Sequence, residues 1–314
     1  MAEQITVVGA GVVGLTCAHE LAAAGHRVRV VADQRPAQTV SAVAAAIWEP
    51  YDVAPADQAL RWSMTSLAAF TALAGDPDTG VVLRSGTVVA HTASPDELWW
   101  AEHIPTRPAE VEELPPGAAS GTVCTVPVIV MPRYLAWLLN RCEQRGVTFE
   151  WRGVDSLDSL DGTGPVVVAC GLRSGALTGD DTLVPARGQV VRVANPGLTH
   201  WYIDDENPAG LTYVIPRLDD VICGGTNTPG GSNITPDPAV TQEILRRAIA
   251  VEPRLDGAQI LDTLVGLRPT RPTVALDHID VGSRPVISCY GHGGAGVTTS
   301  WGAAADVADL IAHL

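Results

Sequence analysis

The chain has 314 residues, 46% of them hydrophobic, and a formal net charge of −15 without a single lysine. Its length is enough for a large core, in two closely joined domains rather than two independent ones. The acidic balance, the lack of a basic cluster and the lack of any apolar run near ~20 residues argue against nucleic acid and membranes as partners.

The missing lysine also excludes lysine Schiff-base chemistry and activation of oxygen by a lysine. The first residues hold no basic segment and lead into a predicted strand, so we expect no signal peptide and a cytoplasmic location. Six scattered cysteines lack a zinc-binding spacing, and we expect no metal. We expect most of them to be buried thiols, with a disulfide between Cys223 and Cys289 as the alternative.

Residues 1–33 have the pattern of a strand, a glycine-rich turn, a helix and a second strand. A strand at 5–8 precedes Gly-Ala-Gly-Val-Val-Gly at 9–14, a helix at 15–24 and a strand at 26–31. Such glycines let the backbone approach a pyrophosphate, and Asp33 stands where an acidic residue binds a ribose hydroxyl. An unoccupied turn and a surface Asp33 are the alternatives.

The middle of the chain alternates helical and strand patterns. Small apolar residues at 42–47 suit a close approach to a cofactor, and residues 105–121 predict a surface loop. Helices are predicted at 60–74, 95–103, 132–145 and 238–251; strands are predicted at 81–90 (paired, turning at Ser85-Gly86), 147–151, 165–169, 184–195 and 201–225, with a mixed pattern at 260–276.

A second glycine-rich turn lies near the end of the chain, at 290–296, between a strand at 286–289 and a helix at 303–313. Two such turns, far apart in sequence, suggest one long cofactor held at both ends, a flavin rather than a nicotinamide. The amides of Gly296, Val297 and Thr298 would stabilise negative charge on a reduced flavin ring. A loop without a ligand is the alternative, and His292 is interpreted as structural rather than as a base.

Two further motifs carry candidate substrate ligands. In Val-Gly-Leu-Arg-Pro-Thr-Arg-Pro at 265–272, two prolines fix the directions of Arg268 and Arg271. A rigid guanidinium binds a carboxylate through two parallel hydrogen bonds, and the Tyr213 hydroxyl on a predicted strand could share that carboxylate. Structural ion pairs for the arginines and a core position for the tyrosine are the alternatives.

Six segments together resemble the D-amino-acid oxidases, flavoproteins of the glutathione-reductase type. They occur in the family's order and span nearly the whole chain: GAGVVGL at 9–15, VVAD at 30–33, VAAAIWEPY at 43–51, YVIPR at 213–217, GLRPTRP at 266–272 and YGHGGAGVTTSWG at 290–302.

The resemblance implies noncovalent FAD, with a D-amino acid and O2 as substrates. A hydride would pass from Cα to flavin N5, giving a 2-oxo acid, ammonia and hydrogen peroxide without an acid–base side chain. Arg268 would hold the carboxylate with help from Tyr213, and the carbonyl of Gly294 would accept a hydrogen bond from the amine. With Gly14 of the first turn, the implied FAD contacts are Gly9, Gly11, Val12, Val13, Asp33, Thr39, Ala45, Ala46, Ile47, Val154, Gly293, Gly296, Val297 and Thr298.

The chain departs from the family pattern at three places. Glu49 stands where glutamine is frequent, and its negative charge could favour amines or disturb the pocket. Pro208-Ala209-Gly210 replaces a tyrosine-bearing lid, and Ala295 replaces a frequent aromatic residue. We therefore expect an open entrance and neutral, bulky side chains in the substrate, with Trp201 or Tyr202 lining the side-chain pocket.

Together these features predict an α/β protein with two domains. A Rossmann-like FAD-binding domain, assembled from 1–50, 130–195 and 285–314, would join an α+β substrate domain of 51–129 and 196–284 built on a mixed or antiparallel sheet. The sequence leaves a homodimer open.

Four other functions stay open at this point. A D-aspartate oxidase would need an extra cation, for which Arg217 and Arg271 are candidates. A glycine or sarcosine oxidase is a second, although the lysine-dependent sarcosine type is disfavoured. The others are a flavin-binding module without turnover and a nicotinamide dehydrogenase that uses only the first turn.

Overall fold

The computed structural model describes residues 4–93, 98–281 and 284–314. At one end of the molecule, parallel strands from distant parts of the chain lie in the order β14 (Val286–His292), β7 (Val166–Val168), β1 (Ile5–Val8), β2 (Val28–Ala32) and β6 (Thr148–Trp151). Valine and isoleucine dominate the central strands because these are buried on both faces. The α/β class predicted from the sequence is thereby confirmed.

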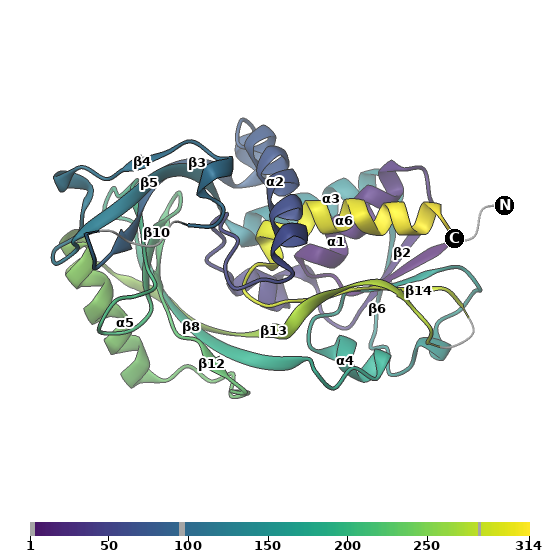
Figure 1. Cartoon of the computed structure of the whole chain (residues 1–314). Coiled ribbons are helices and arrows are strands. Elements are labelled where there is room, and N and C mark those ends of the chain that lie inside the picture. The colour runs from purple at the N-terminus through teal and green to yellow at the C-terminus, as the bar shows by residue number, and fades with distance from the viewer. Residues whose placement is uncertain (1–3, 94–97, 282–283) are drawn as a thin grey trace.

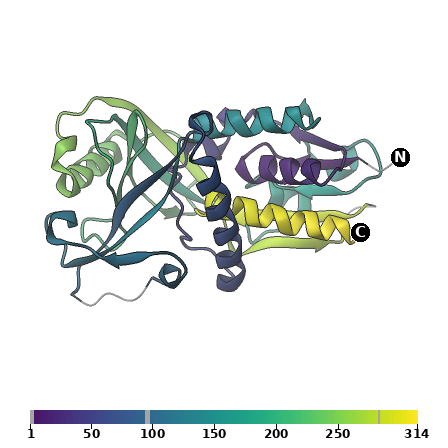
Figure 2. The same ribbon diagram turned by 90° about the horizontal axis from the view of Figure 1, so that it is seen from above.

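Three helices lie side by side on one face of these parallel strands: α1 (Val12–Ala23), α3 (Met131–Gln144) and α6 (Gly296–Ala312) (Figures 1 and 2). Helix α2 (Ala56–Leu73) crosses α6, and the short α4 (Arg173–Thr178) lies on the opposite side of the sheet (Figure 1). A Cβ atom at Gly302 would overlap the backbone of Trp62, so this glycine permits the close crossing. Asp306 reinforces it by accepting hydrogen bonds from Arg61 and Trp62.

The other end of the molecule is antiparallel and carries α5 (Pro238–Val251) on its outside (Figure 1). Asp237 caps the N-terminus of helix α5. Its carboxylate accepts a hydrogen bond from the amide of Ala239 at 2.8 Å. The strands of this end are β3 (Val81–Ala90), β4 (Thr106–Pro108), β5 (Ser120–Ile129), β8 (Val184–Ala194), β9 (Trp201–Asp204), β10 (Thr212–Pro216), β11 (Asp220–Gly224) and β12 (Thr228–Pro229). Within it, β3 and β9 form a parallel pair.

Strand β13 (Ile260–Ile279) joins the two ends into one sheet. Its first half pairs with β8 up to Thr270, and its second half pairs with β14. The sequence predicted a separate second sheet and only a mixed pattern at 260–276; instead, one 20-residue strand runs through both prolines. A single sheet continues through both ends and gives no break at which to divide them. The two-domain boundaries predicted from the sequence therefore stay a prediction.

Residues 81–90 form one strand, so the turn predicted at Ser85-Gly86 is wrong. Gly86 is needed for packing, because the ring of Trp201 lies against its backbone and a Cβ atom there would overlap that ring. The loop predicted at 105–121 also contains β4 and the start of β5, which the sequence analysis missed. Of the helix predicted at 95–103, residues 94–97 lie outside the described part, and the rest forms only a short 3-10 turn at Ala101–His103.

The last strand and the last helix are both longer than the sequence predicted. Strand β14 extends through the glycine-rich turn to His292, and α6 begins at Gly296 rather than at 303. All six cysteines are free thiols, and the sulfur of Cys289 lies 4.0 Å from that of Cys17 rather than bonded to Cys223. No helix in the described ranges is long and apolar enough to cross a membrane.

The packing of Trp201 gives a test of the fold. In Gly86→Ala, the new methyl group must push Trp201 away, and we expect the free energy of unfolding to fall by about 1–3 kcal/mol. Urea unfolding followed by tryptophan fluorescence measures this. The control is Gly75→Ala, where no atom lies within 4 Å of the new Cβ and a change within about 0.5 kcal/mol is expected. Equal effects at both glycines would contradict the packing argument.

Candidate active site

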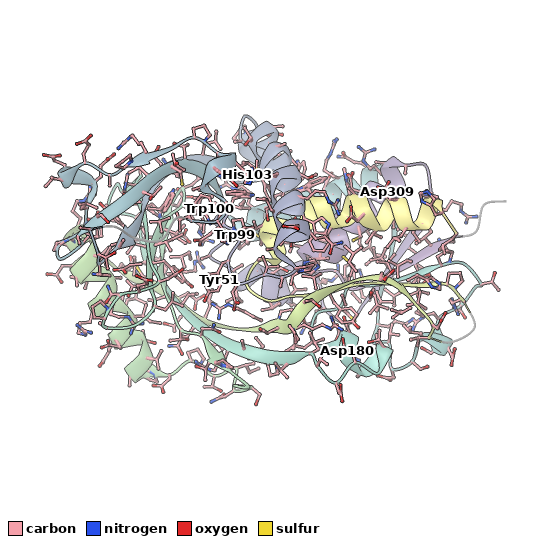
Figure 3. The ribbon with its side chains drawn as sticks, viewed as in Figure 1. Tyr51, Trp99, Trp100, His103, Asp180 and Asp309 are labelled. Atoms are coloured by element: carbon pink, nitrogen blue, oxygen red, sulfur yellow. The ribbon has the colours of Figure 1, made fainter. Side chains whose placement is uncertain are left out.

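A cavity of about 660 Å³ extends through the middle of the molecule. Both glycine-rich turns line it, and so do residues of the segment 38–51 and of β8, β10 and β13. Asp33, after β2, and Tyr213, on β10, both line it, so groups 180 residues apart in the chain face one space. Figure 3 shows Tyr51, another lining residue, in the middle of the molecule above β13.

The first glycine-rich turn packs α1 tightly against β1. Gly9 has φ +117°, and a Cβ atom there would overlap the carbonyl of Ala169. A Cβ atom at Gly14 would overlap the carbonyl of Gly9, so Gly14 supports the turn from behind and does not line the cavity. Ser41 Oγ accepts from the amide of Val12 at 3.0 Å, whereas the amide of Val13 has no partner in the described part of the chain.

Asp33 lies at the cavity, but its carboxylate also has a protein partner. Arg173, which follows the turn after β7, donates to Asp33 at 2.8 Å and to the carbonyl of Val154 at 3.2 Å. Both side chains of the ion pair are partly exposed, so it contributes little stability. Val154 is buried and does not line the cavity, and its carbonyl accepts from Arg173.

The second glycine-rich turn places the first turn of α6 at the cavity. Gly293 has φ +54°, and its amide donates to the carbonyl of Pro269 at 2.9 Å. Helix α6 has no side-chain cap, and in the described ranges the amides of Gly296, Val297 and Thr298 have no protein partner. These are the donors that the sequence predicted for the flavin ring.

His292 is a structural residue, as the sequence suggested. Its Nδ1 lies 2.9 Å from Thr299 Oγ1, and its Nε2 lies 3.8 Å from the sulfur of Cys289. Burial lowers the pKa of His292 to about 4, so the ring is neutral at pH 7. With one nitrogen bound to a helix hydroxyl, the ring secures the turn to α6.

Arg268 lies on the backbone of β8 and points to the cavity. A Cβ atom at Gly188 would lie 2.5 Å from Nη1 of Arg268, so only glycine leaves room for the guanidinium. Nη1 donates to the carbonyl of Thr226 at 3.0 Å. In the described ranges no carboxylate pairs with Arg268, so its charge is available to a bound anion.

Tyr213 and Gly294 lie beside Arg268. The Tyr213 ring covers the backbone of Gly224, where a Cβ atom would overlap the ring, and its hydroxyl is within hydrogen-bonding reach of Arg268. Burial raises the pKa of Tyr213, which keeps the hydroxyl protonated and able to donate. A Cβ atom at Gly294 would lie 3.1 Å from the Tyr51 ring and 3.7 Å from Cδ of Arg268, so the three residues adjoin.

The two other arginines considered as substrate ligands are used inside the protein. Arg217 is buried and binds Asp220 through both Nε, at 2.6 Å, and Nη2. Arg271 binds Asp180 at 2.7 Å and the carbonyl of Thr273 at 2.7 Å. Neither lines the cavity. For both residues the structural ion pair, and not the ligand role, is correct.

Two carboxyl groups also line the cavity. Burial, and next the charge of Asp205, raises the pKa of Glu49 to about 8. Burial, and next the charges of Asp204 and Glu206, raises the pKa of Asp205 to about 6. Glu49 is therefore largely protonated at pH 7, and only one full negative charge faces Arg268 there.

Most predicted site residues line this one cavity. These are Gly9, Gly11, Val12, Val13, Asp33, Thr39, Ala45, Ala46, Ile47, Tyr213, Arg268, Gly293, Gly294, Gly296, Val297 and Thr298. Gly14 and Val154 do not line it. Trp201 and Tyr202 are buried in the core, and Ile203 lines the cavity instead. Ala295 is buried too, so its small size does not widen the entrance.

The sequence analysis missed Arg173, Gly188 and Asp205. Arg173 directly follows a glycine turn after a buried strand, which is a recognisable position for a ligand-binding residue. Gly188 and Asp205 carry no motif, because their roles depend on which strands pair. Residues 208–210, which replace the tyrosine-bearing lid of the family pattern, form a tight turn. In it the amide of Gly210 donates to the carbonyl of Asn207 at 2.8 Å.

The lining suits FAD. Unpartnered helix amides lie at both glycine-rich turns, where a pyrophosphate and the ring carbonyls need donors. An acidic side chain follows β2, and the small residues Ala44, Ala45 and Ala46 lie between the two turns. Among the described residues no cluster of metal ligands occurs.

Comparison with known proteins shows the family to which this chain belongs. A family model described as FAD dependent oxidoreductase matches residues 4–310, so the chain belongs to that family. It is an oxidoreductase that uses FAD, as the sequence predicted.

Relatives within this family are similar over almost the whole chain. A D-amino-acid oxidase of Rubrobacter xylanophilus is 47% identical over 307 residues, covering 97% of this chain and 94% of the relative. Human D-aspartate oxidase is 34% identical over 99% of this chain and 95% of its own length. Glycine oxidase from Bacillus cereus has the same fold, with a TM-score of 0.83, 22% identity and coverage of 99% and 95% of the two chains.

The pKa of Glu49 predicts how stability depends on pH. Between pH 4.5 and about 8 the folded state holds more protons at Glu49 than the unfolded state does. The free energy of unfolding therefore falls as pH rises, by up to about 1.4 kcal/mol per pH unit from this group. Glu49→Gln should lose this contribution, so that the variant gains stability relative to the wild type from pH 5.5 to 7.5.

Urea unfolding with excess FAD at three pH values in that range measures the effect. The exposed Glu112 gives the control: Glu112→Gln should keep the wild-type pH dependence. Parallel pH curves for the wild type and Glu49→Gln would contradict the prediction.

Proposed function

We propose that this protein catalyses the oxidative deamination of D-amino acids to 2-oxo acids, ammonia and hydrogen peroxide, as a D-amino-acid oxidase of the glutathione-reductase type. The observation that carries the proposal is the position of Arg268. Its unpaired guanidinium lies on Gly188, next to Tyr213 and Gly294, in the cavity that both glycine-rich turns line. The name of the relative from Rubrobacter xylanophilus supports the same reaction.

Three groups orient the substrate in this proposal. Arg268 binds the carboxylate through two N–H donors, and the Tyr213 hydroxyl adds a third hydrogen bond. The carbonyl of Gly294, next to Arg268, accepts from the amine. With carboxylate and amine fixed, only one enantiomer directs its Cα hydrogen toward the first turn of α6 while its side chain occupies the cavity.

FAD, when bound, supplies the acceptor for the hydride of Cα and passes the electrons to O2. The chain's own contribution is position and electrostatics. Gly296, Val297 and Thr298 offer amides to negative charge, and Ile47, Ile203 and Ile215 exclude water from the reacting atoms. Both nitrogens of the neutral His292 ring lie against protein groups, Thr299 Oγ1 and the sulfur of Cys289, in agreement with a reaction that needs no base.

A D-aspartate oxidase is the less supported alternative. It needs a second free cation for the side-chain carboxylate, but Arg217 and Arg271 are neutralised by Asp220 and Asp180. The negative charge of Asp205 at the cavity would repel a dicarboxylate. A cytoplasmic location, a homodimer and an accessible entrance for bulky neutral side chains remain predictions from the sequence.

Flavin reduction tests the reaction directly. Under anaerobic conditions, D-alanine should bleach the yellow holoenzyme, and L-alanine should leave its visible spectrum unchanged. If no member of a panel of D-amino acids bleached the flavin, the protein would be a flavin-binding module without turnover. A colourless purified protein that binds a nicotinamide would contradict the proposal altogether.

Arg268→Ala tests the carboxylate contact. Loss of a charge-assisted bidentate contact worth ~1.5–3 kcal/mol should raise KM for D-alanine or D-methionine by about ten- to a hundredfold, with FAD retained. Peroxide release measures KM, and the visible spectrum measures FAD. Arg271→Ala, from the same motif but outside the cavity, should change KM less than about twofold. Wild-type kinetics in Arg268→Ala would refute the assignment.

A further inference from the structure

We propose that Glu49 is a specificity-determining residue and that, together with Asp205, it favours D-amino acids whose side chains end in a cation, such as D-lysine, over neutral side chains of the same size. This inference rests on the function proposed above. It concerns two lining residues, Glu49 and Asp205, that take no part in the proposed contacts of Arg268, Tyr213 and Gly294.

The two carboxyl groups come from different elements and face the cavity that Arg268 lines. Glu49 is fixed at its backbone: Thr298 Oγ1 accepts from its amide at 3.2 Å and donates to its carbonyl at 2.9 Å. This ties Glu49 to the first turn of α6, where the flavin ring is expected. Asp205 directly follows β9, two residues beyond Ile203, and Ile203 stands opposite Tyr213 in the sheet.

Neither carboxyl group has a partner within the protein. In the described ranges no hydrogen bond or ion pair joins the side chain of Glu49 or Asp205 to another residue, and the charge of Asp205 helps to raise the pKa of Glu49. The adjacent Asp204 is different, because His91 and Asn207 bind its two oxygens at 2.9 and 2.7 Å. Asp204 is thus paired, whereas the carboxyl groups of Glu49 and Asp205 are available to a ligand.

The charges of the cavity match a substrate with two cations. Arg268 neutralises the α-carboxylate, and two carboxyl groups remain. A neutral D-amino acid carries no cation besides its α-ammonium group, which the carbonyl of Gly294 already binds in the proposed function, so Glu49 stays protonated or unpaired. A D-amino acid with a cationic side chain offers two, and the charge-assisted contacts then offset the cost of removing both cations from water.

The rest of the wall suits the stem of such a side chain. Ile47, Val190, Ile203 and Ile215 line the same cavity as the two acidic residues. Methylene groups of lysine or arginine can pack on this apolar surface while the charged end reaches a carboxylate. Glu49 is the less solvent-accessible of the two cavity-lining residues, so Glu49 should contribute more.

D-lysine and D-norleucine form a matched pair for the test, since their side chains differ only in the terminal ammonium group. With the wild-type holoenzyme, kcat/KM for D-lysine should exceed that for D-norleucine at least tenfold. Glu49→Gln should lower kcat/KM for D-lysine at least tenfold, mostly through KM, and change that for D-norleucine less than threefold. Asp205→Asn should act in the same direction but more weakly.

Glu206→Gln provides the control, because it removes the same charge one residue from Asp205 but outside the cavity lining. We expect it to change the D-lysine to D-norleucine ratio less than twofold. The visible spectrum shows whether each variant has folded with FAD. If Glu49→Gln does not fold, the inference is tested by the ratio of kcat/KM for D-lysine to that for D-norleucine in the wild type and in Asp205→Asn.

Three results would overturn the inference. One is a wild-type enzyme that oxidises D-norleucine as well as D-lysine. Another is an equal loss for both substrates in Glu49→Gln, which would place the carboxyl group at the shared α-amine. The third is turnover of neither substrate, nor of any other D-amino acid, in which case the proposed function itself has failed.

Discussion

The guanidinium of Arg268 lies against the backbone of Gly188, and the geometry of the proposed substrate site depends on this contact. Gly188 on β8 stands opposite Gly266 on β13, and Arg268 follows two residues later on the same strand. Any side chain at 188 would occupy the space of the guanidinium. The carbonyl of Thr226 accepts one N–H, and no carboxylate in the described part of the chain pairs with the other donors.

The distribution of charge around this arginine is as informative as its position. The chain has 35 acidic and 20 basic residues, so an arginine easily finds a carboxylate. Arg173, Arg217 and Arg271 have done so, whereas Arg268 has not. Conversely, among the described residues no cation forms an ion pair with Glu49 or Asp205. The cavity therefore has a positive and a negative part, and a zwitterion is the simplest ligand that satisfies both.

Helix α6 connects the cofactor region to the acidic wall. Its first turn offers free amides and, through Thr298, holds both backbone groups of Glu49. Further along, Gly302 lets Trp62 of α2 approach, and Asp306 fixes that crossing through Arg61. The same helix turn offers the free amides and binds Glu49. The position of Glu49 is therefore coupled to that of the groups expected to hold the flavin ring.

The sequence by itself determined the α/β class, both glycine-rich turns, the FAD-dependent family and the candidacy of Arg268 and Tyr213, because each of these is written in short local patterns. Glycine spacing, strand–helix periodicity and prolines beside an arginine need no knowledge of distant contacts. Only the tertiary structure decided that β13 joins the two ends into one sheet, that Gly86 serves packing rather than a turn, and that Arg217 and Arg271 are already paired. It also brought Gly188, Asp205 and Glu49 to one cavity. Strand pairing and burial set these roles, and both arise between residues that lie far apart in the chain.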